Sequence, residues 1–137
     1  MRAPKLASGI LRAMTRAAQE LGELGERIAE RWMRRKGWRL VGRRFRNGHR
    51  DIDLIVEGED TVVFVEVKAR TGAGCGDPVE AVDWRKHREL ARSARVWIDR
   101  FGRPGKGYRF DVIGVLVEGD RVRVRHVEDA FSVPPGG

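Results

Sequence analysis

Apolar and polar residues alternate with a period of two along two adjacent stretches, residues 50–56 and 61–68. Residues two positions apart lie on the same face of a β-strand, so the alternation predicts two strands. The acidic break at 57–60, which contains Gly58, predicts a short turn between them. We expect the first strand to place three residues on each face: Asp51, Asp53 and Ile55 on one, and Ile52, Leu54 and Val56 on the other.

The second strand, 61–68, ends in two charged residues on an otherwise apolar face. The same periodicity places Val62, Phe64, Glu66 and Lys68 on one face and Val63, Val65 and Val67 on the other. If the polar faces of the two strands coincide, Asp53, Glu66 and Lys68 converge on one site. Burying such charges without partners costs on the order of several kcal/mol, so we infer that the cluster has a function.

Helical spacing of apolar residues predicts a first amphipathic helix over residues 21–36, which ends at Gly37. Glu26 borders the apolar stripe of this helix. The residues of the stripe are Leu21, Leu24, Ile28, Ala29, Trp32 and Met33.

A second amphipathic helix is expected to run to about residue 100. Asp77 suits its N-cap, Pro78 its first position and Glu80 a capping acid. Lys86 lies on the apolar stripe, where its ammonium either extends to the surface or reaches an anionic site at the sheet. The apolar residues of the stripe are Val79, Val82, Leu90, Ala94, Trp97, Ile98 and Phe101.

The remaining strands frame these elements. Residues 38–46 predict a basic edge strand, and Asn47-Gly48 predicts a hairpin into the strand that follows. Residues 109–117 and 121–127 predict a strand pair across an acidic turn, with Asp111 as a structural ion-pair partner. We therefore expect a single domain at 21–131, a basic amphipathic extension at 1–20 and a flexible tail at 132–137.

Residues 1–20 contain no acidic residue before Glu20. Such a basic, amphipathic stretch is typical of a transit peptide or an interfacial helix, and the alternative is a few extra helical turns ahead of the domain. No stretch has the roughly 18–20 apolar residues of a membrane span. Cys75 is the sole cysteine, which excludes an intramolecular disulfide and fits a cytoplasmic location.

Positive charge is concentrated in the first part of the chain. The net charge is +8; residues 1–50 hold 14 Lys and Arg against 4 Asp and Glu, whereas residues 51–137 hold 14 against 16. This asymmetry favours a phosphate backbone or another anionic surface as partner. A solvated arginine-rich surface is the alternative.

Two carboxylates that converge on one point suit a hard divalent cation such as Mg²⁺ or Mn²⁺. A metal held by Asp53 and Glu66 can polarise a phosphodiester and generate hydroxide from bound water. Lys68, on the same face, is placed to orient that water or stabilise charge on the phosphate.

The succession of motifs resembles the YraN-like bacterial proteins, relatives of Holliday-junction resolvases in the PD-(D/E)XK nuclease superfamily. The resemblance covers roughly residues 21–117. The sequence departs from the family pattern in having Arg50-Asp51 where Gly-Glu is usual before Ile-Asp-Leu-Ile. The segments that match are Gly25-Glu26 with Ala29, Gly37, 51–55, 63–70, 78–82, Lys86 and 110–112.

The resemblance implies an α/β fold, with a restriction-endonuclease-like αβββαβ core and a mixed central sheet flanked by helices. It also implies metal ligation by Asp53 and Glu66, a catalytic Lys68 and participation of Glu26. Resolvases of this kind are usually dimers, and Trp84 or the N-terminal helix are candidate homodimer surfaces.

Three functions remain open at this point. The first is a Mg²⁺-dependent endonuclease that acts on branched or damaged DNA, and the second is a non-catalytic nucleic-acid-binding module on a nuclease scaffold. The third is an interaction protein whose N-terminal helix docks a partner or a membrane. The expected nucleic-acid contacts are Arg31, Arg34, Arg35, Arg43, Arg44, Arg46, Arg70 and Lys86.

Overall fold

A mixed five-stranded sheet lies between two helices in the computed structural model, which describes residues 5–72 and 83–132. The strands follow the order β1-β2-β3-β4-β5; β3 and β4 are parallel and the other neighbours antiparallel. The expected α/β fold with a mixed central sheet flanked by helices is confirmed. The elements are α1 (Lys5–Arg35), β1 (Arg39–Phe45), β2 (Ile52–Glu57), β3 (Thr61–Thr71), α2 (Trp84–Phe101), β4 (Gly107–Glu118) and β5 (Arg121–Phe131).

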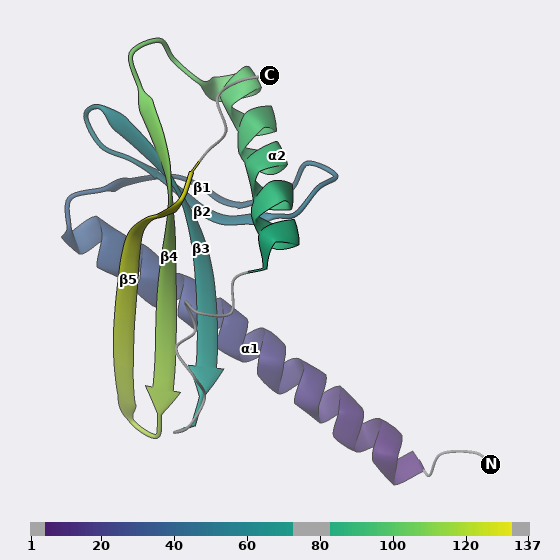
Figure 1. Ribbon diagram of the computed structural model, residues 1–137. Helices are drawn as coiled ribbons and strands as arrows, with labels where there is room; N and C mark the ends of the chain where they lie inside the picture. The colour runs from purple at the N-terminus through teal and green to yellow at the C-terminus, as the bar shows by residue number, and fades with distance from the viewer. Residues whose placement is uncertain (1–4, 73–82, 133–137) are drawn as a thin grey trace.

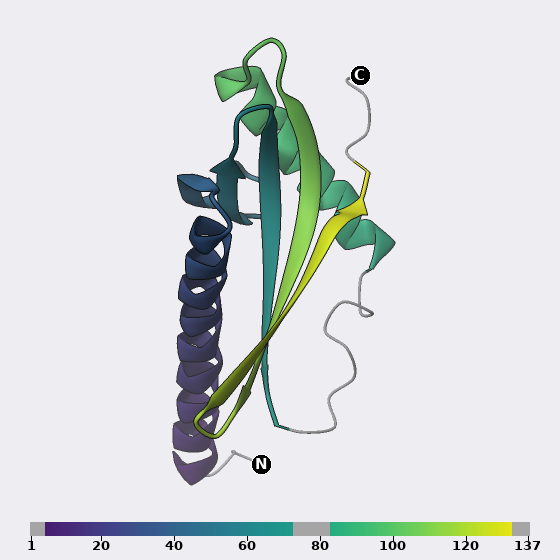
Figure 2. The same cartoon turned by 90° about the vertical axis from the view of Figure 1, so that its left-hand side faces the viewer.

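The two helices cover opposite faces of the sheet, α1 on one and α2 on the other (Figures 1 and 2). The α1 face buries Ala29 and Met33 against Leu54, Val63 and Val65. The α2 face has a second cluster, whose main members are Ile52, Ile55, Phe64, Leu90, Trp97 and Phe110. Because parallel strands need a crossover, the connection through α2 carries the chain from β3 to β4 over that second face.

Helix α1 is longer than the sequence predicts. It begins at Lys5, so the second alternative for the N-terminal stretch, extra helical turns, describes its conformation. Residues 8–20 are exposed, and α1 extends past the sheet (Figure 1). Gly37, with φ +95°, follows the end of the helix as expected. None of the described helices is both long and apolar enough to cross a membrane.

The alternation predicted for β3 is confirmed, whereas that for β2 is wrong at one residue. Val62 and Phe64 face α2, and Val63 and Val65 face α1. In β2, however, Ile52 packs with Ile55 against α2 and does not join Leu54 and Val56. The pairing of β2 with β3 extends only as far as Leu54 opposite Val65, so the pleat is not held by β3 at Ile52 and Asp53.

Helix α2 differs from the prediction at its start, whereas its end at Phe101 confirms the expected end at about residue 100. It begins at Trp84, and Asp83 is its N-cap, accepting a hydrogen bond from the backbone N–H of Arg85 at 2.9 Å. Asp77, Pro78 and Glu80, as well as Val79, Val82 and Cys75, lie outside the described residues. Phe101, which was expected to be buried, is 55% exposed. It packs on Phe45 of β1, which is an edge strand of the described sheet, so one side of its ring faces solvent.

Candidate active site

Asp53 lies where β2 separates from β3, and its carboxylate bridges the two strands. Its Oδ2 accepts a hydrogen bond from the backbone N–H of Val67 at 2.8 Å. Asp53 contributes to the lining of three neighbouring surface cavities. One lies under α1, one lies between the β1–β2 loop and α2, and the third is lined by residues of α1 together with Arg46 and Val67. The side chain is therefore held by the sheet and accessible from more than one direction.

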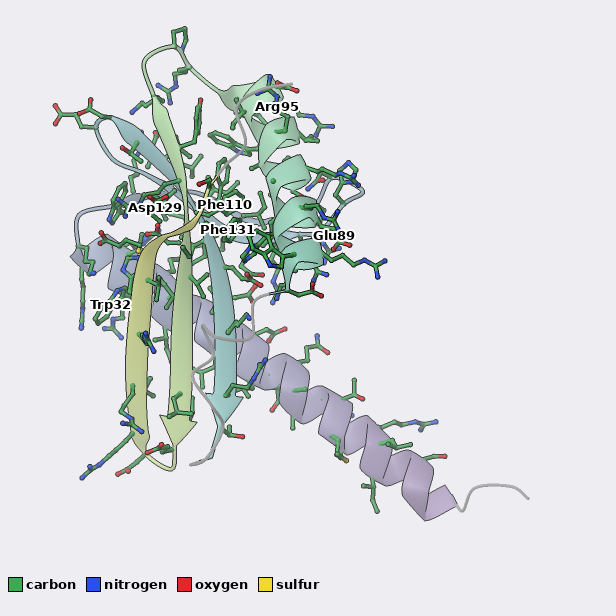
Figure 3. The ribbon with its side chains drawn as sticks, in the orientation of Figure 1. Trp32, Glu89, Arg95, Phe110, Asp129 and Phe131 are labelled. Atoms are coloured by element: carbon green, nitrogen blue, oxygen red, sulfur yellow. The ribbon has the colours of Figure 1, made fainter. Side chains whose placement is uncertain are left out.

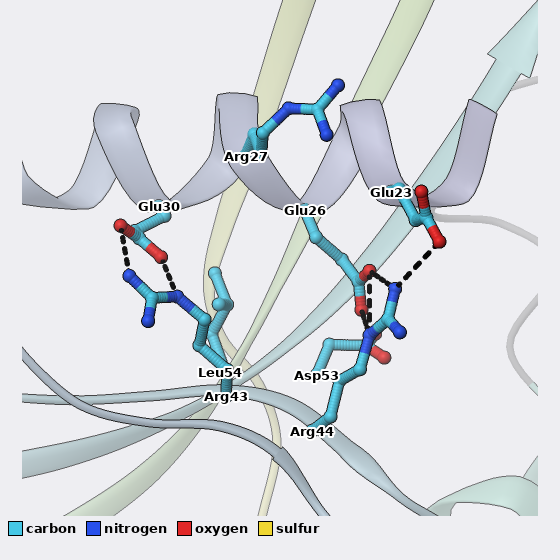
Figure 4. Close-up of a pocket in the computed structure, with 8 residues that line it drawn as sticks. All are labelled: Glu23, Glu26, Arg27, Glu30, Arg43, Arg44, Asp53 and Leu54. Carbon is cyan, nitrogen blue, oxygen red and sulfur yellow. Dashed lines mark hydrogen bonds and ion pairs between the residues drawn. The ribbon is translucent and has the colours of Figure 1, made fainter. Parts of the chain in front are cut away.

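Acidic residues of α1 and basic residues of β1 line the cavity under α1, whose volume is about 370 Å³ (Figure 4). The Arg44 guanidinium donates to both carboxylate oxygens of Glu26, with its Nη2 at 2.9 Å from Glu26 Oε2. Arg43 donates in the same bidentate way to Glu30, at 2.6 and 3.0 Å. Glu26, the residue predicted to join the site from the first helix, thus faces the side of Asp53 that α1 covers.

Glu66 lies on the opposite face of β3, toward α2, and is 4% exposed. Its Oε1 forms an ion pair with the ammonium of Lys86 on α2. Of the two alternatives for Lys86, the structure therefore shows the one in which the ammonium reaches an anionic group at the sheet. The other carboxylate oxygen, Oε2, is buried and has no hydrogen-bond partner among the described residues.

Burial and charge perturb the titration of the site residues. Burial raises the pKa of Asp53 to about 6; the Val67 N–H lowers it, and the charges of Glu26 and Glu66 add to the rise. Burial likewise lowers the pKa of Lys68, Glu66 opposes this shift, and the neighbouring cation Lys86 adds to it. The charge of Glu66 thus acts on both Asp53 and Lys68.

The carboxylate oxygens of Asp53 and Glu66 are the candidate ligands for a divalent metal ion. Among the described residues, no three His, Cys, Asp or Glu side chains form a group that would hold a metal by themselves. Mg²⁺ often needs only one or two protein carboxylates and takes waters and phosphate oxygens as its other ligands. Glu66 Oε2 is buried and has no hydrogen-bond partner among the described residues, and the pKa of Asp53 is raised. The negative charge of both carboxylates is therefore incompletely compensated, and the pair fits such an ion.

The expected nucleic-acid contacts are spread over the molecule. Arg44 and Arg46 line a cavity together with Asp53, and Arg46 lies 3.6 Å from Asp51. Arg31, Arg34 and Arg35 are exposed on α1, and none of them lines the described cavities at Asp53. Arg70 is exposed near the end of β3 and donates to its neighbouring carbonyl, that of Ala69, at 2.9 Å.

Two features of the site have no counterpart in the sequence analysis. His87 has both ring nitrogens buried and without hydrogen-bond partners in the described part of the chain, and the charges of Glu66 and Lys68 act on its pKa. Arg44 has a left-handed backbone, with φ +47°, which is strained for a residue other than glycine. A lone histidine and one arginine among many give no spacing pattern by which to find them.

A second buried carboxylate, Asp111 on β4, has a different environment. Arg109 donates two hydrogen bonds to it at 2.9 and 3.0 Å, and the backbone N–H of Asp129 donates another at 3.0 Å. His126 Nε2 lies 2.7 Å from Asp111 Oδ2, and Trp32 of α1 donates to the other His126 nitrogen at 3.2 Å (Figure 3). The structural role expected of Asp111 is confirmed, because these contacts tie β4, β5 and α1 together.

Comparison with known proteins gives many related sequences. The model of the uncharacterised protein family UPF0102 matches residues 25–115. A UPF0102 protein of Rhodococcus jostii is 39% identical over 112 residues, which cover 81% of this chain and 95% of that protein. A UPF0102 protein of Nocardia farcinica is 37% identical over 127 residues, 92% of this chain and all of that protein, and one of Syntrophomonas wolfei is 36% identical over 113 residues, 82% of this chain and 98% of that protein.

Proposed function

The chain belongs to the uncharacterised protein family UPF0102, and we propose that it is a metal-dependent endonuclease that acts on DNA. The observation that supports this function best is a pair of incompletely neutralised carboxylates on adjacent strands, the partly buried Asp53 and the buried Glu66. A carboxylate with a raised pKa beside a cavity, as Asp53 is, is more frequent at functional sites than elsewhere. The resemblance to resolvases of the PD-(D/E)XK superfamily points to the same chemistry.

Asp53 and Glu66 are the residues that would hold Mg²⁺ or Mn²⁺. An ion held there would supply polarisation of the scissile phosphodiester and a bound water of lowered pKa. The ammonium of Lys68, on the same face of β3 as Glu66, then stabilises the negative charge that develops on the phosphate. Because burial lowers its pKa, Lys68 is also better suited to exchange a proton near neutral pH than an exposed lysine.

Glu26 and Lys86 shape the charge of the site from the two helices. Glu26 holds the Arg44 guanidinium beside Asp53, where the arginine is placed to contact a phosphate of the substrate. Lys86 supplies the counter-charge of Glu66 before the metal binds. The basic residues of α1 and β1 add a sequence-independent attraction for the DNA backbone.

A cleavage assay tests the proposal. The purified protein is incubated with Mg²⁺ or Mn²⁺ and nicked, flapped, four-way or single-stranded DNA. We expect cleavage to fall by about 10²-fold or more in Asp53→Asn and Glu66→Gln, the range for loss of strong electrostatic stabilisation of a transition state. Asp99→Asn, which removes an exposed carboxylate of α2, serves as the control and should cleave as the wild type does.

Absence of cleavage of every substrate, or equal cleavage by Asp53→Asn and the wild type, would show that the proposed activity is wrong.

The second candidate is a nucleic-acid-binding module without turnover. Two observations favour it: Glu66 Oε1 is already paired with Lys86, and no group of three metal-ligating side chains is found among the described residues. It predicts strongly salt-dependent DNA binding that is unchanged in Asp53→Asn.

A further inference from the structure

Trp84, the first residue of α2, is 81% exposed, more than any other large apolar side chain in the described part of the chain. Trp97, four turns further along the same helix, is 5% exposed, and Trp32 and Trp38 are partly buried against the α1 face of the sheet. Burial of an indole contributes strongly to folding or binding. An indole left in water at the edge of a candidate active site therefore indicates a binding partner.

The Trp84 ring is held by a column of aromatic rings that begins in the core. It packs edge-to-face on His87 at 5.9 Å between centroids, and His87 stacks on Phe131 at 3.8 Å. Phe131 stacks in turn on the buried Phe110 at 4.4 Å (Figure 3). Because the lower rings are fixed by packing, the indole is presented to solvent on a firm base, and little side-chain entropy is lost when a ligand contacts it.

The charge around Trp84 suits a nucleic acid. The first turn of α2 contains no acidic residue. The side chain of Arg85 is 79% exposed, and Arg88 is also exposed on the following turn. Two residues after Trp84, the ammonium of Lys86 contacts Glu66 in the site to which we assign cleavage. The exposed ring thus lies near Arg85, Arg88 and Lys86, although the N-cap Asp83 precedes it and Glu89 lies 3.7 Å from Arg85. It packs on His87, on which the charges of Glu66 and Lys68 act, and this contact links Trp84 to the site to which we assign cleavage.

We propose that Trp84 stacks on an unpaired base of the substrate. Aromatic side chains beside basic residues bind single-stranded nucleic acid in this way, because every base has an exposed π-face when it is not stacked on neighbours. The inference rests on the proposed function for the position of the site. It names the substrate class: DNA with an unpaired base next to the scissile phosphate, such as a flap, gap or branch, in preference to continuous duplex.

Binding measured in EDTA tests the inference, since cleavage cannot occur without metal. Fluorescence anisotropy is recorded with a labelled single strand, a flapped duplex and a blunt duplex of the same sequence. Loss of one base–aromatic stack should weaken binding of Trp84→Ala to the single strand and the flap by about 5- to 100-fold. Binding to the blunt duplex should change less than about twofold, and Trp84→Phe should retain most of the affinity because its ring still stacks.

Phe101→Ala, which removes an exposed aromatic ring at the other end of α2, is the matched control and should leave all three affinities unchanged. Equal affinities of Trp84→Ala and the wild type for the single strand would overturn the inference, as would an equal loss on single strand and duplex. It would also fail if anionic phospholipid vesicles, but not the single strand, protected Trp84 from acrylamide quenching. If Trp84→Ala loses affinity for the single strand and the flap but not for the duplex, and the wild type cleaves no substrate, only the proposed activity is overturned. If the wild type cleaves DNA and Trp84→Ala shows no such selective loss of affinity, only this inference is overturned.

Discussion

Asp111 and Glu66 are buried carboxylates and Asp53 is a partly buried one on the same sheet, yet the surroundings of Asp111 are opposite in kind to those of the Asp53–Glu66 pair. The carboxylate of Asp111 is fully buried and contacts Arg109, His126 and the N–H of Asp129. Glu66 has one oxygen paired with Lys86 and the other without a partner among the described residues. The first arrangement stabilises the fold, whereas the second leaves binding capacity for a ligand.

The pKa directions express the same contrast. Burial alone would raise the pKa of Asp111, but hydrogen bonds from His126, Arg109 and the Asp129 N–H outweigh it, so the pKa lies below its ordinary value. At Asp53 burial prevails, and the pKa rises to about 6. A buried acid therefore marks a candidate site when its environment disfavours the charge, not simply because it is buried.

The largest effect is expected from Asp111→Ala. The substitution leaves the partly buried Arg109 and His126 without this fully buried acceptor, and breaking a buried charge pair typically costs about 3–5 kcal/mol in the free energy of unfolding. Urea denaturation monitored by circular dichroism measures it. Asp99→Ala, at an exposed pair on α2, should change stability by less than about 0.5 kcal/mol. If Asp111→Ala lowered the free energy of unfolding by as little as Asp99→Ala, the structural role of Asp111 and its contrast with the Asp53–Glu66 pair would be contradicted.

Asp53→Asn is expected to act in the opposite direction and to stabilise the metal-free protein. Because the folded-state pKa of Asp53 exceeds the ordinary 3.8, the folded state binds more protons between pH 3.8 and about 6. Stability falls as pH rises through that window and stays lower above it. Asparagine removes the charge and can still accept from the Val67 N–H, so at pH 8 the gain should be about 1–3 kcal/mol.

The gain in stability from Asp53→Asn should largely disappear at about pH 3.5, where the wild-type Asp53 carboxyl is mostly protonated in both the folded and the unfolded state. Thermal unfolding at pH 3.5 and at pH 8, with EDTA present, measures the difference. Asp111→Asn is the matched variant: because the pKa of Asp111 is lowered, its contribution is present at pH 8 and is lost as pH falls through the folded-state pKa. Destabilisation by Asp53→Asn at pH 8 would contradict the assignment.

Lys86→Ala should have a smaller and metal-dependent effect. It removes the counter-ion of Glu66 and should lower the metal-free stability by about 1–2 kcal/mol, since Lys86 is itself partly exposed. If a divalent ion replaces that charge, millimolar Mg²⁺ should raise the melting temperature of the variant more than that of the wild type. A melting temperature that does not respond to Mg²⁺ in either protein would argue against a metal at Glu66.

The sequence was sufficient for the strands and for the antiparallel pairs β1–β2, β2–β3 and β4–β5, because local patterns determine them, but not for the parallel pairing of β3 with β4. The alternation in 61–68, the Asn47-Gly48 hairpin and the acidic turns specify neighbouring antiparallel strands without long-range information. The convergence of Asp53, Glu66 and Lys68 followed from the same periodicity. It stays a prediction: Asp53 reaches β3 through a hydrogen bond from the Val67 N–H and lines the cavity under α1, whereas Glu66 faces α2.

What the sequence did not predict depends on contacts between distant segments. His87 stacks on Phe131, which is 44 positions away in the chain, and its ring nitrogens are without hydrogen-bond partners among the described residues. The left-handed backbone of Arg44 accompanies its reach toward Glu26 on α1. Phe101 was expected to be buried because helical spacing identifies a face, and spacing alone does not show where the covering sheet ends.

The close approach of α1 to β3 has a consequence for sequence variation. A Cβ atom at Gly25 would lie 2.7 Å from the Cβ of Ala69, so the two positions share one small volume between helix and sheet. Among related sequences we expect them to co-vary in size, a larger residue at one accompanying glycine at the other. Glu26 adjoins this contact, so an uncompensated Gly25→Ala would also shift the charge that acts on Asp53, whereas Gly25→Ala combined with Ala69→Gly should restore it.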